Sequence, residues 1–429
     1  MYIVRLLFII GMLSVSLGTP AYAVQLAIAC GAEGQEFKIC KEGAEAWAYQ
    51  TGNTVTFLSS PNSSSEKLAL YQQFLAAQDA SVDVFQIDVI WLGILRRHFM
   101  DLKPYVPESV LGGHFPNLIA NNTVDGHLIA MPWFVDAGLL YYRQDLLEKY
   151  HRPVPNTWEE LEETAHTIQE GERKDGNPKF WGFVWQGRAF EGLTCNALEW
   201  VESFGGGSIV EPDGKISINN PQAVKALQTA ASWINTISPK GVLNYSEEET
   251  RGVFQSGNAA FMRNWPYVWQ LIQSGDSPVK DKVGIAILPA GSEHGKHIAT
   301  LGGWELGVSK YSRHPKEAID LVLYLTSAPE QKRRAIAGTF NPTIMALYQN
   351  REILQTMPFL SSLYEVFANA GVRPSTVTGK KYNQVSSGFW NAVHETLSGS
   401  QDAASSLRLL ETRLDRISHH EEWEHTNGK

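Results

Sequence analysis

The chain has 429 residues, with 45 acidic and 36 basic side chains and a formal net charge of −9 at pH 7. This length suffices for two or more domains with their own cores. The acidic balance argues against nucleic acid or an anionic membrane surface as a partner. Three cysteines are too few for a disulfide scaffold in a chain of this size, so ordinary apolar cores must hold the protein together.

The first 23 residues have the form of a cleaved secretory signal. A start with one positive charge (1–5) precedes an apolar run (6–18) and the small-x-small sequence Ala-Tyr-Ala at 21–23. The run is too short to span a bilayer, so we predict that residues 1–23 are removed on export. Two alternatives are a buried N-terminal helix and a lipid-modified N-terminus at Cys30, which lies well beyond the apolar run.

Strand-like and helix-like segments alternate from the predicted mature N-terminus onward. The pattern predicts a parallel sheet with helices on both sides. Its expected strands and helices follow one another at 26–30, 36–50, 54–58, 67–77 and 82–87.

Further elements are predicted by local signals later in the chain. Thr157 and Glu160 have capping-box spacing and open a helix. The charged stretch 170–178 is expected to be a surface loop, and 316–326 a helix. The tail 419–429 is expected to be flexible.

Asp88 is the first candidate for ligand binding. It ends the strand 82–87 and precedes an apolar helix start at 89–95. In open α/β sheets, ligands gather outside the carboxyl ends of the strands. Asp is also a preferred helix N-cap residue, and position alone does not choose between these two roles.

Four further clusters combine aromatic, charged and glycine residues. Glycine lets the backbone approach a ligand closely, and tryptophan offers a flat apolar face. For each tryptophan taken alone, core packing is the better explanation, and for the arginine taken alone a surface salt bridge is. The residues of interest are Phe134 and Asp136 in MPWFVDAG, Trp265 in RNWPY, Gly303 and Trp304 in LGGWELGV, and Arg373 in VRP.

In this order, the clusters resemble the solute-binding proteins of bacterial and archaeal ABC sugar importers, and within them the trehalose/maltose-binding branch. The similar stretches include DVFQIDVIWLG, DAGLLYYRQDLLEKY, FWGFVWQGRAFEGL, GNAAFMRNWPYVW and TLGGWELGVSKYS, and they extend from about residue 82 to 373.

The resemblance implies an α/β, two-lobe periplasmic binding protein fold of type II, with the ligand cleft between lobes joined by a multi-segment hinge. The lobes expected from it comprise 24–134 with about 292–340, and about 137–288 with about 342–418.

The resemblance also implies roles for individual residues. Asp88 and Asp136 would accept hydrogen bonds from sugar hydroxyls, and Arg373 would donate a bidentate pair. Trp265 and Trp304 would stack on pyranose rings. Further contacts would come from the Gly303 backbone, Lys67, Tyr382 and an acidic side chain after the first strand, for which Glu33, Gln35 and Glu36 compete.

The function implied is that of a substrate-binding component that captures a disaccharide such as trehalose or maltose and delivers it to an ABC permease by lobe closure. It would act in the periplasm as a monomer, without cofactor or metal. Phe134 stands where relatives can carry tyrosine, so sucrose, another α-glucoside or a polyol is an alternative cargo.

An exported glycoside hydrolase is the alternative from another class. It would need a carboxylate pair flanking the scissile bond, and nothing in the sequence marks a proton donor. No histidine falls in an HExxH pattern, and the glycines at 205–207 lack a P-loop lysine. Whether Cys30 and Cys40 pair is open, and Cys195 would be left over.

Overall fold

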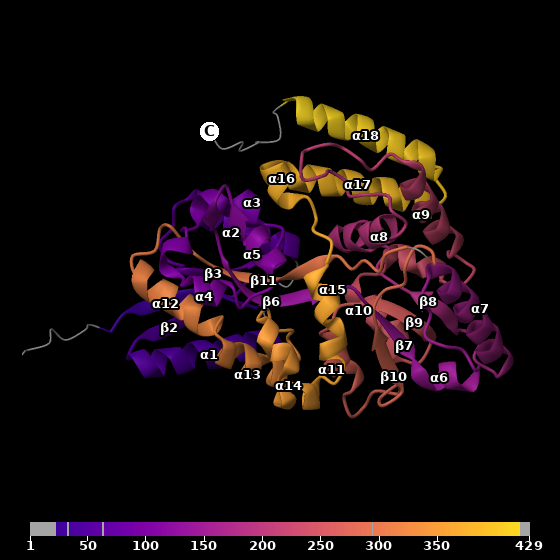
Figure 1. Cartoon of the computed structure of the whole chain (residues 1–429), viewed down its shortest axis with the longest axis horizontal. Coiled ribbons are helices and arrows are strands. Elements are labelled where there is room, and N and C mark those ends of the chain that lie inside the picture. Colours follow the sequence, from indigo (N-terminus) through magenta and orange to yellow (C-terminus); the bar gives the residue numbers. More distant parts are fainter. Residues whose placement is uncertain (1–22, 32–33, 62–63, 294, 421–429) are drawn as a thin grey trace, which may run out of the picture.

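A computed structural model of the chain describes residues 23–31, 34–61, 64–293 and 295–420. They form two α/β bodies side by side, each with its own sheet (Figure 1), which confirms the α/β class. Residues 1–22 of the predicted signal and 421–429 of the predicted tail lie outside the described residues. Residues 419 and 420 belong to the last helix, because the helical backbone continues past the position where the tail was expected to begin.

The first body is built on a five-stranded sheet whose strand order is β2-β1-β3-β11-β6. β1 pairs in parallel with β2 and β3, as the alternating pattern predicted. β11 runs antiparallel between β3 and β6, although more than 200 residues separate it from β3. The strands are β1 (Gln25–Ala29), β2 (Thr54–Phe57), β3 (Val84–Asp88), β6 (Met131–Ala137) and β11 (Leu301–Val308).

Helices cover both faces of this sheet. One apolar core joins the sheet to α1 (Gly34–Thr51) and α12 (Pro315–Leu325), and the second joins it to α2 (Ser64–Ala76) and the short α3 (Leu92–Leu95). α13 (Ala328–Gly338) packs beside α1. A Cys30–Cys40 disulfide ties the end of β1 to α1, which answers the question that the sequence left open.

The second body contains a four-stranded sheet of order β10-β7-β9-β8. β7 pairs antiparallel with β10 and β9, and β8 pairs in parallel with β9. Buried tryptophans, including Trp158, Trp185, Trp200 and Trp233, fill its core. The strands are β7 (Leu139–Arg143), β8 (Trp181–Val184), β9 (Ala259–Asn264) and β10 (Val283–Ala286).

The predicted capping box is confirmed at the start of α7 (Trp158–Lys174), where Thr157 and Glu160 bond reciprocally. The loop predicted for 170–178 is wrong for its first half, because α7 extends to Lys174. There Glu172 accepts from Lys149 at 2.7 Å and Arg173 donates to a backbone carbonyl, so these charged residues find partners on the last turns of the helix.

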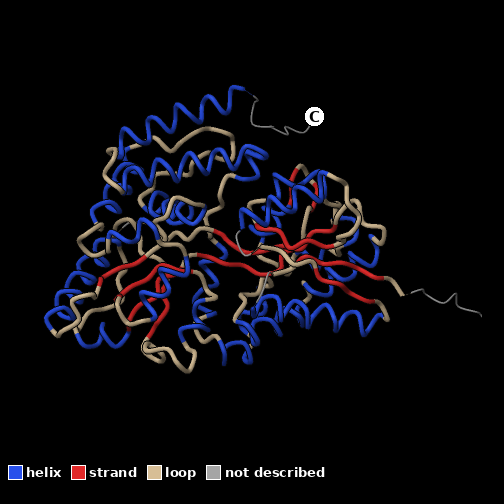
Figure 2. The backbone as a smooth tube through the Cα atoms, turned by 180° about the vertical axis from the view of Figure 1, so that it is seen from behind, coloured by secondary structure: helices blue, strands red, loops and turns tan. Residues whose placement is uncertain are grey.

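In the second body, further helices form layers that extend away from its sheet (Figures 1 and 2). α8, α9, α17 and α18 pack on one another. Their bounds are α8 (Glu191–Ser203), α9 (Pro221–Ser232), α10 (Glu247–Gln255), α11 (Val268–Ile272), α17 (Tyr382–Leu397) and α18 (Ala403–His420). The shorter elements of the whole chain are α4 (Glu108–Leu111), α5 (Pro116–Asn122), β4 (Thr123–Val124), β5 (His127–Leu128), α6 (Gln144–Lys149), α14 (Arg351–Thr356), α15 (Tyr364–Ala368) and α16 (Ser375–Thr378).

Several chain segments pass between the two bodies. Gly138 alone separates β6 of the first sheet from β7 of the second. The start of β11 bonds to Gly371, with the Leu301 N–H donating to the Gly371 carbonyl at 2.8 Å. After this crossing α16 packs on α3, where a Cβ on Gly93 would lie 2.6 Å from the Ser375 carbonyl oxygen. The two bodies are therefore joined by these crossing segments.

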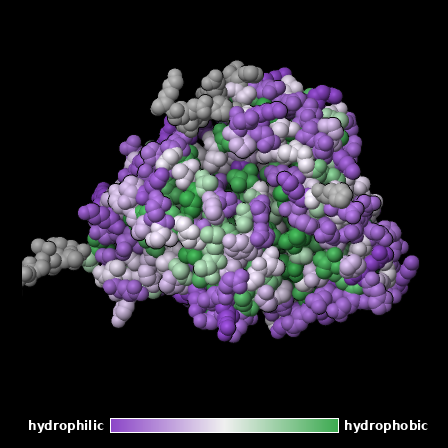
Figure 3. Space-filling model, in the orientation of Figure 1, coloured by the Kyte–Doolittle hydropathy of each residue, from purple (hydrophilic) through white to green (hydrophobic). Residues whose placement is uncertain are grey.

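Hydrophilic residues dominate the edges of the face in Figure 3, and hydrophobic ones gather toward its middle. Over the described residues, no helix combines the length and apolar character needed to cross a bilayer.

Candidate binding site

A cavity of about 540 Å³ lies between the two bodies, within the size range of small-molecule sites. Residues from both bodies line it. Eight of the ten predicted site residues are among them, namely Glu36, Asp88, Phe134, Asp136, Trp265, Gly303, Trp304 and Arg373.

Asp88 stands at the carboxyl end of β3, opposite Trp304 of β11. Its Oδ1 accepts a hydrogen bond from the Ile90 N–H at 3.2 Å, and its side chain is 16% exposed. Trp91 is the N-cap residue of α3, and the described residues give that helix no side-chain cap. The helix-cap interpretation is therefore wrong, because Asp88 fixes the turn before the helix. Burial raises the pKa of Asp88.

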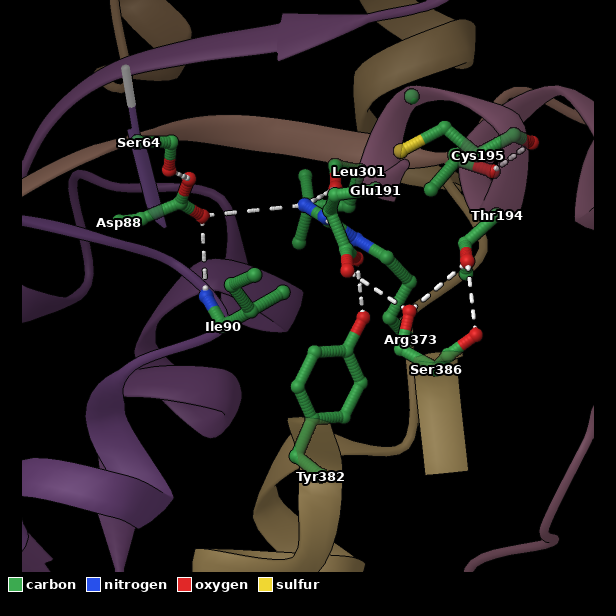
Figure 4. A network of polar contacts seen from close by, with 12 residues as sticks. Ser64, Asp88, Ile90, Glu191, Thr194, Cys195, Leu301, Arg373, Tyr382 and Ser386 are labelled. Carbon is green, nitrogen blue, oxygen red and sulfur yellow. Dashed lines mark hydrogen bonds and ion pairs between the residues drawn. The ribbon is translucent and has the colours of Figure 1, made fainter. Parts of the chain in front are cut away.

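Arg373 lies on the segment that crosses between the bodies, and its side chain is 5% exposed. Its Nη1 donates to Glu191 Oε1 at 2.9 Å, and its Nη2 donates to the Leu301 carbonyl at 3.1 Å. Nη2 also lies 3.9 Å from Asp88 Oδ1 (Figure 4). The surface salt-bridge interpretation is wrong, because the guanidinium is buried where the two bodies meet.

Two more carboxylates lie on the side of the first body. Asp136 is near the end of β6, and Glu36 is in the first turn of α1. Burial, and then the negative charge of Glu36, raise the pKa of Asp136 to about 7. Glu36 accepts a hydrogen bond from Gln86 Nε2. Of the three alternatives for this role, Glu36 lines the cavity, while Glu33 and the side chain of Gln35 lie outside the described part of the chain.

Each body contributes one tryptophan to the cavity wall, and each ring has a cation against it. Lys67 Nζ is 4.4 Å from the ring centroid of Trp304, and the Arg263 guanidinium is 4.0 Å from that of Trp265. Trp265 Nε1 also donates to Glu247 at 3.4 Å. These contacts fix the orientation of both rings.

Glycine is required beside these rings. Gly303 has a φ of +127°, and a Cβ there would come within 2.4 Å of the Phe134 carbonyl oxygen. At Gly302 a Cβ would lie 3.1 Å from the Trp265 ring. The glycine pair therefore allows β11 to pass close to the cavity.

The Phe134 ring forms an apolar wall with Phe340, their centroids 4.8 Å apart. Behind them the buried Arg334 stacks on Trp133 at 3.7 Å and on Phe134 at 4.9 Å. Burial lowers the pKa of Arg334 to about 9. The aromatic faces thus hold a cation on the side of the wall away from the cavity lining.

The last two predicted residues lie behind the lining. Lys67 is 4% exposed beneath Trp304, and burial lowers its pKa. Tyr382 is fully buried in a core of the first body, and its hydroxyl donates to Glu191. Both therefore contact lining side chains rather than form the lining.

Sequence reasoning missed several lining residues, of which the charged ones matter most chemically. Glu191 and Arg188 lie within FWGFVWQGRAFEGL, one of the stretches that carry the resemblance, so the signal was present without a role attached to it. Glu247 lies in an acidic run that opens α10. The others include Phe190, Cys195, Tyr267, Thr339 and Phe340.

The lining therefore combines five carboxylates with two guanidinium groups and two indole faces. Such a set can accept and donate hydrogen bonds to a polyhydroxylated molecule and cover its apolar faces. In the described ranges, no group of three or more His, Cys, Asp or Glu side chains is placed to hold a metal ion. A second cavity of about 670 Å³ shares Arg373 with the first and is lined by Glu202, Lys296 and Val377, among others.

Residues 31–332 match the family model described as bacterial extracellular solute-binding protein. The chain belongs to this family. The solute-binding protein is 54% identical over 400 residues to a probable ABC transporter-binding protein of Deinococcus radiodurans, a match that covers 93% of this chain and 95% of the relative. The family binds solutes rather than transforming them, which confirms that the protein is not an enzyme.

Solved structures share the whole fold. Maltose-bound T. maritima MalE3 is 38% identical and superposes with a TM-score of 0.83 over 92% of this chain and 100% of that one. A solute-binding protein of an ABC transporter from Thermotoga lettingae, bound with α-D-tagatose, is 20% identical, with a TM-score of 0.79 over 92% and 100% of the two chains. The predicted two-lobe architecture is therefore confirmed.

Proposed function

We propose that this solute-binding protein captures a disaccharide such as maltose or trehalose in the cleft and delivers it to an ABC permease. The observation that carries the proposal is the meeting of Trp265 and Trp304, one from each body, with Asp88, Asp136 and Arg373 around one cavity. The maltose named for the T. maritima relative supports the same class of ligand.

The chemistry of the lining suits a neutral sugar. The C–H faces of a pyranose ring carry a weakly positive apolar patch that favours the negative face of an indole ring. Each hydroxyl can donate to a carboxylate and accept from a guanidinium. A polar group left unpaired by the wrong sugar costs about 1–3 kcal/mol, so such a site selects its cargo strongly.

A sugar that touches both bodies stabilises their approach, because a ligand shifts a conformational equilibrium by its differential affinity for the two states. The closed form would then be the one that a permease recognises. In this proposal the lobes comprise 24–134 with about 292–340, and about 137–288 with about 342–418. The protein acts as a monomer.

We also propose that the protein works in the periplasm after cleavage of residues 1–23. The extracellular family supports export. The Cys30–Cys40 disulfide supports a protein without a lipid anchor at Cys30, because that thiol is already bonded.

Calorimetric titration of the mature protein tests the proposal against maltose, trehalose, sucrose, glucose and mannitol, with a product assay on the same mixtures. We expect one-to-one binding of maltose or trehalose with no free glucose formed from either. Preference for sucrose or mannitol would reassign the cargo. Glucose release in proportion to protein would contradict a binding function, and binding of none of the five would contradict the sugar class.

A further inference from the structure

The guanidinium of Arg373 and the carboxylate of Asp88 form an ion pair without a direct hydrogen bond (Figure 4). Nη2 lies 3.9 Å from Oδ1, whereas a charge-assisted N–H···O bond has a length of about 2.7–2.9 Å. The two side chains are only 5% and 16% exposed. Opposite charges this close and this shielded from water attract strongly, so the separation needs a cause.

Glu191 supplies a competing negative charge on the other side of Arg373. Its Oε1 accepts from Arg373 Nη1 at 2.9 Å and from the Tyr382 hydroxyl. Its Oε2 accepts from Ser386 Oγ at 2.7 Å. Figure 4 shows these donors converging on one carboxylate. Three donors, Arg373 and two from the first turns of α17, therefore hold this carboxylate in place at the start of α8.

Arg373 and Asp88 both keep hydrogen-bonding groups that a ligand could use. A guanidinium has five N–H donors. One on Nη1 goes to Glu191 and one on Nη2 goes to Leu301. Three remain: one on Nη1, one on Nη2, and the buried Nε–H, which has no partner among the described residues. Asp88 accepts from Ile90 and, weakly, from Ser64 at 3.5 Å, and keeps lone pairs of its own. Glu191 has most of its lone pairs occupied within the protein.

We propose that Glu191 is a positioning residue that holds Arg373 back from Asp88, so that both groups stay open for one sugar hydroxyl. This inference rests on the proposed sugar-binding function. A hydroxyl between them donates to Asp88 and accepts from Arg373. Without the charge of Glu191, the guanidinium moves onto Asp88, and a sugar must break that pair before it binds.

The first test needs no sugar. In a crystal structure of Glu191→Gln, we expect the distance from Arg373 Nη2 to Asp88 Oδ1 to shorten from 3.9 Å to about 2.8 Å. The matched control is Ser386→Ala, which removes one donor to Glu191 and keeps its charge, so the separation should persist. An unchanged separation in Glu191→Gln would overturn the proposal.

If Glu191→Gln does not fold, Glu191→Asp tests the same movement of Arg373 toward Asp88. Its shorter side chain keeps the charge and withdraws the carboxylate from Arg373. Closure of the gap onto Asp88 is again the expected result once the bond from Arg373 to position 191 is lost. An Arg373 that loses this bond and still keeps its 3.9 Å separation from Asp88 would contradict the proposal.

The second test is a double-mutant cycle measured by calorimetry with maltose and trehalose. Glu191→Gln should weaken binding about tenfold or more in the wild-type background, and less than threefold in an Asp88→Asn background, where no pair can form. Equal losses in both backgrounds would mean that Glu191 acts on the sugar or on the fold instead. If the wild type binds neither sugar, the proposed function fails, and the crystallographic distance still decides the role of Glu191.

Discussion

Asp136 should make the protein less stable as pH rises, and Asp136→Asn should remove that dependence. Its pKa is raised from 3.8 to about 7 by burial and by the charge of Glu36. The folded state therefore binds more protons than the unfolded state between about pH 4 and 7. The free energy of unfolding falls as pH rises through this window and reaches its full loss above pH 7.

The size of the effect follows from the pKa change. One pKa unit corresponds to about 1.4 kcal/mol, so moving the pKa from 3.8 to about 7 corresponds to a loss of up to about 4 kcal/mol at pH 8. Asparagine keeps the shape and carries no charge. We expect Asp136→Asn to raise the free energy of unfolding by about 2–4 kcal/mol at pH 8 and to leave it nearly unchanged at pH 4.

Urea unfolding followed by tryptophan fluorescence at pH 4, 6 and 8 measures this difference. Asp83→Asn is the matched control, because the buried Asp83 carboxylate accepts from the Ala27 N–H at 2.8 Å and from Ser312 Oγ at 2.5 Å. An amide there would face a donor and should lower stability at pH 8. An Asp136→Asn gain of equal size at pH 4 and pH 8, or a loss at pH 8, would mean that ionisation of Asp136 does not cause the pH dependence.

Three further predictions concern the wall of the cleft and the two bodies. Trp304→Ala should weaken sugar binding by about 1–3 kcal/mol in calorimetry, and unchanged affinity with normal melting would remove the ring from the site. Cys30→Ser should lower the urea-unfolding free energy by about 3 kcal/mol, since the Cys30–Cys40 bridge spans 10 residues; equal unfolding with and without reductant would contradict this. Glu199→Gln should lower the free energy of unfolding in urea by about 3–5 kcal/mol, because it leaves the buried Arg263 without its ion-pair partner. Adding Arg263→Met to the same chain should restore much of that stability. No recovery in the double variant would argue against the ion pair as the cause.

Local signals predicted local structure well. The alternation from residue 26 to 87 predicted the parallel strands β1, β2 and β3, and the spacing of Thr157 and Glu160 predicted the start of α7. Both depend on contacts within a few residues or between successive elements. The insertion of β11 between β3 and β6 depends on segments far apart in the sequence, so no local pattern could announce it.

For the candidate site too, the sequence predicted which residues are involved better than it predicted where they lie. Motif resemblance identified Asp88, Trp265 and Trp304, all of which line the cavity. It also selected Lys67, which lies beneath a tryptophan that it supports. Sequence spacing reports that a residue belongs near a site, but not which side of an aromatic ring it occupies.

Glu191 illustrates what sequence reasoning could not reach. Its partners Arg373, Tyr382 and Ser386 lie more than 180 residues away along the chain. They meet it only because the crossing segment, the start of α17 and the start of α8 come together in the fold. The stretch FWGFVWQGRAFEGL that contains Glu191 pointed to the family, but its sequence carries no trace of these three partners.

A crystal structure of the protein with its tightest-binding sugar would show whether a sugar is held between the two tryptophans. We expect one sugar in the cavity between the bodies, with a ring against Trp265 or Trp304 and a hydroxyl between Asp88 and Arg373. A sugar bound instead in the second cavity, beside Glu202 and Lys296, would contradict it.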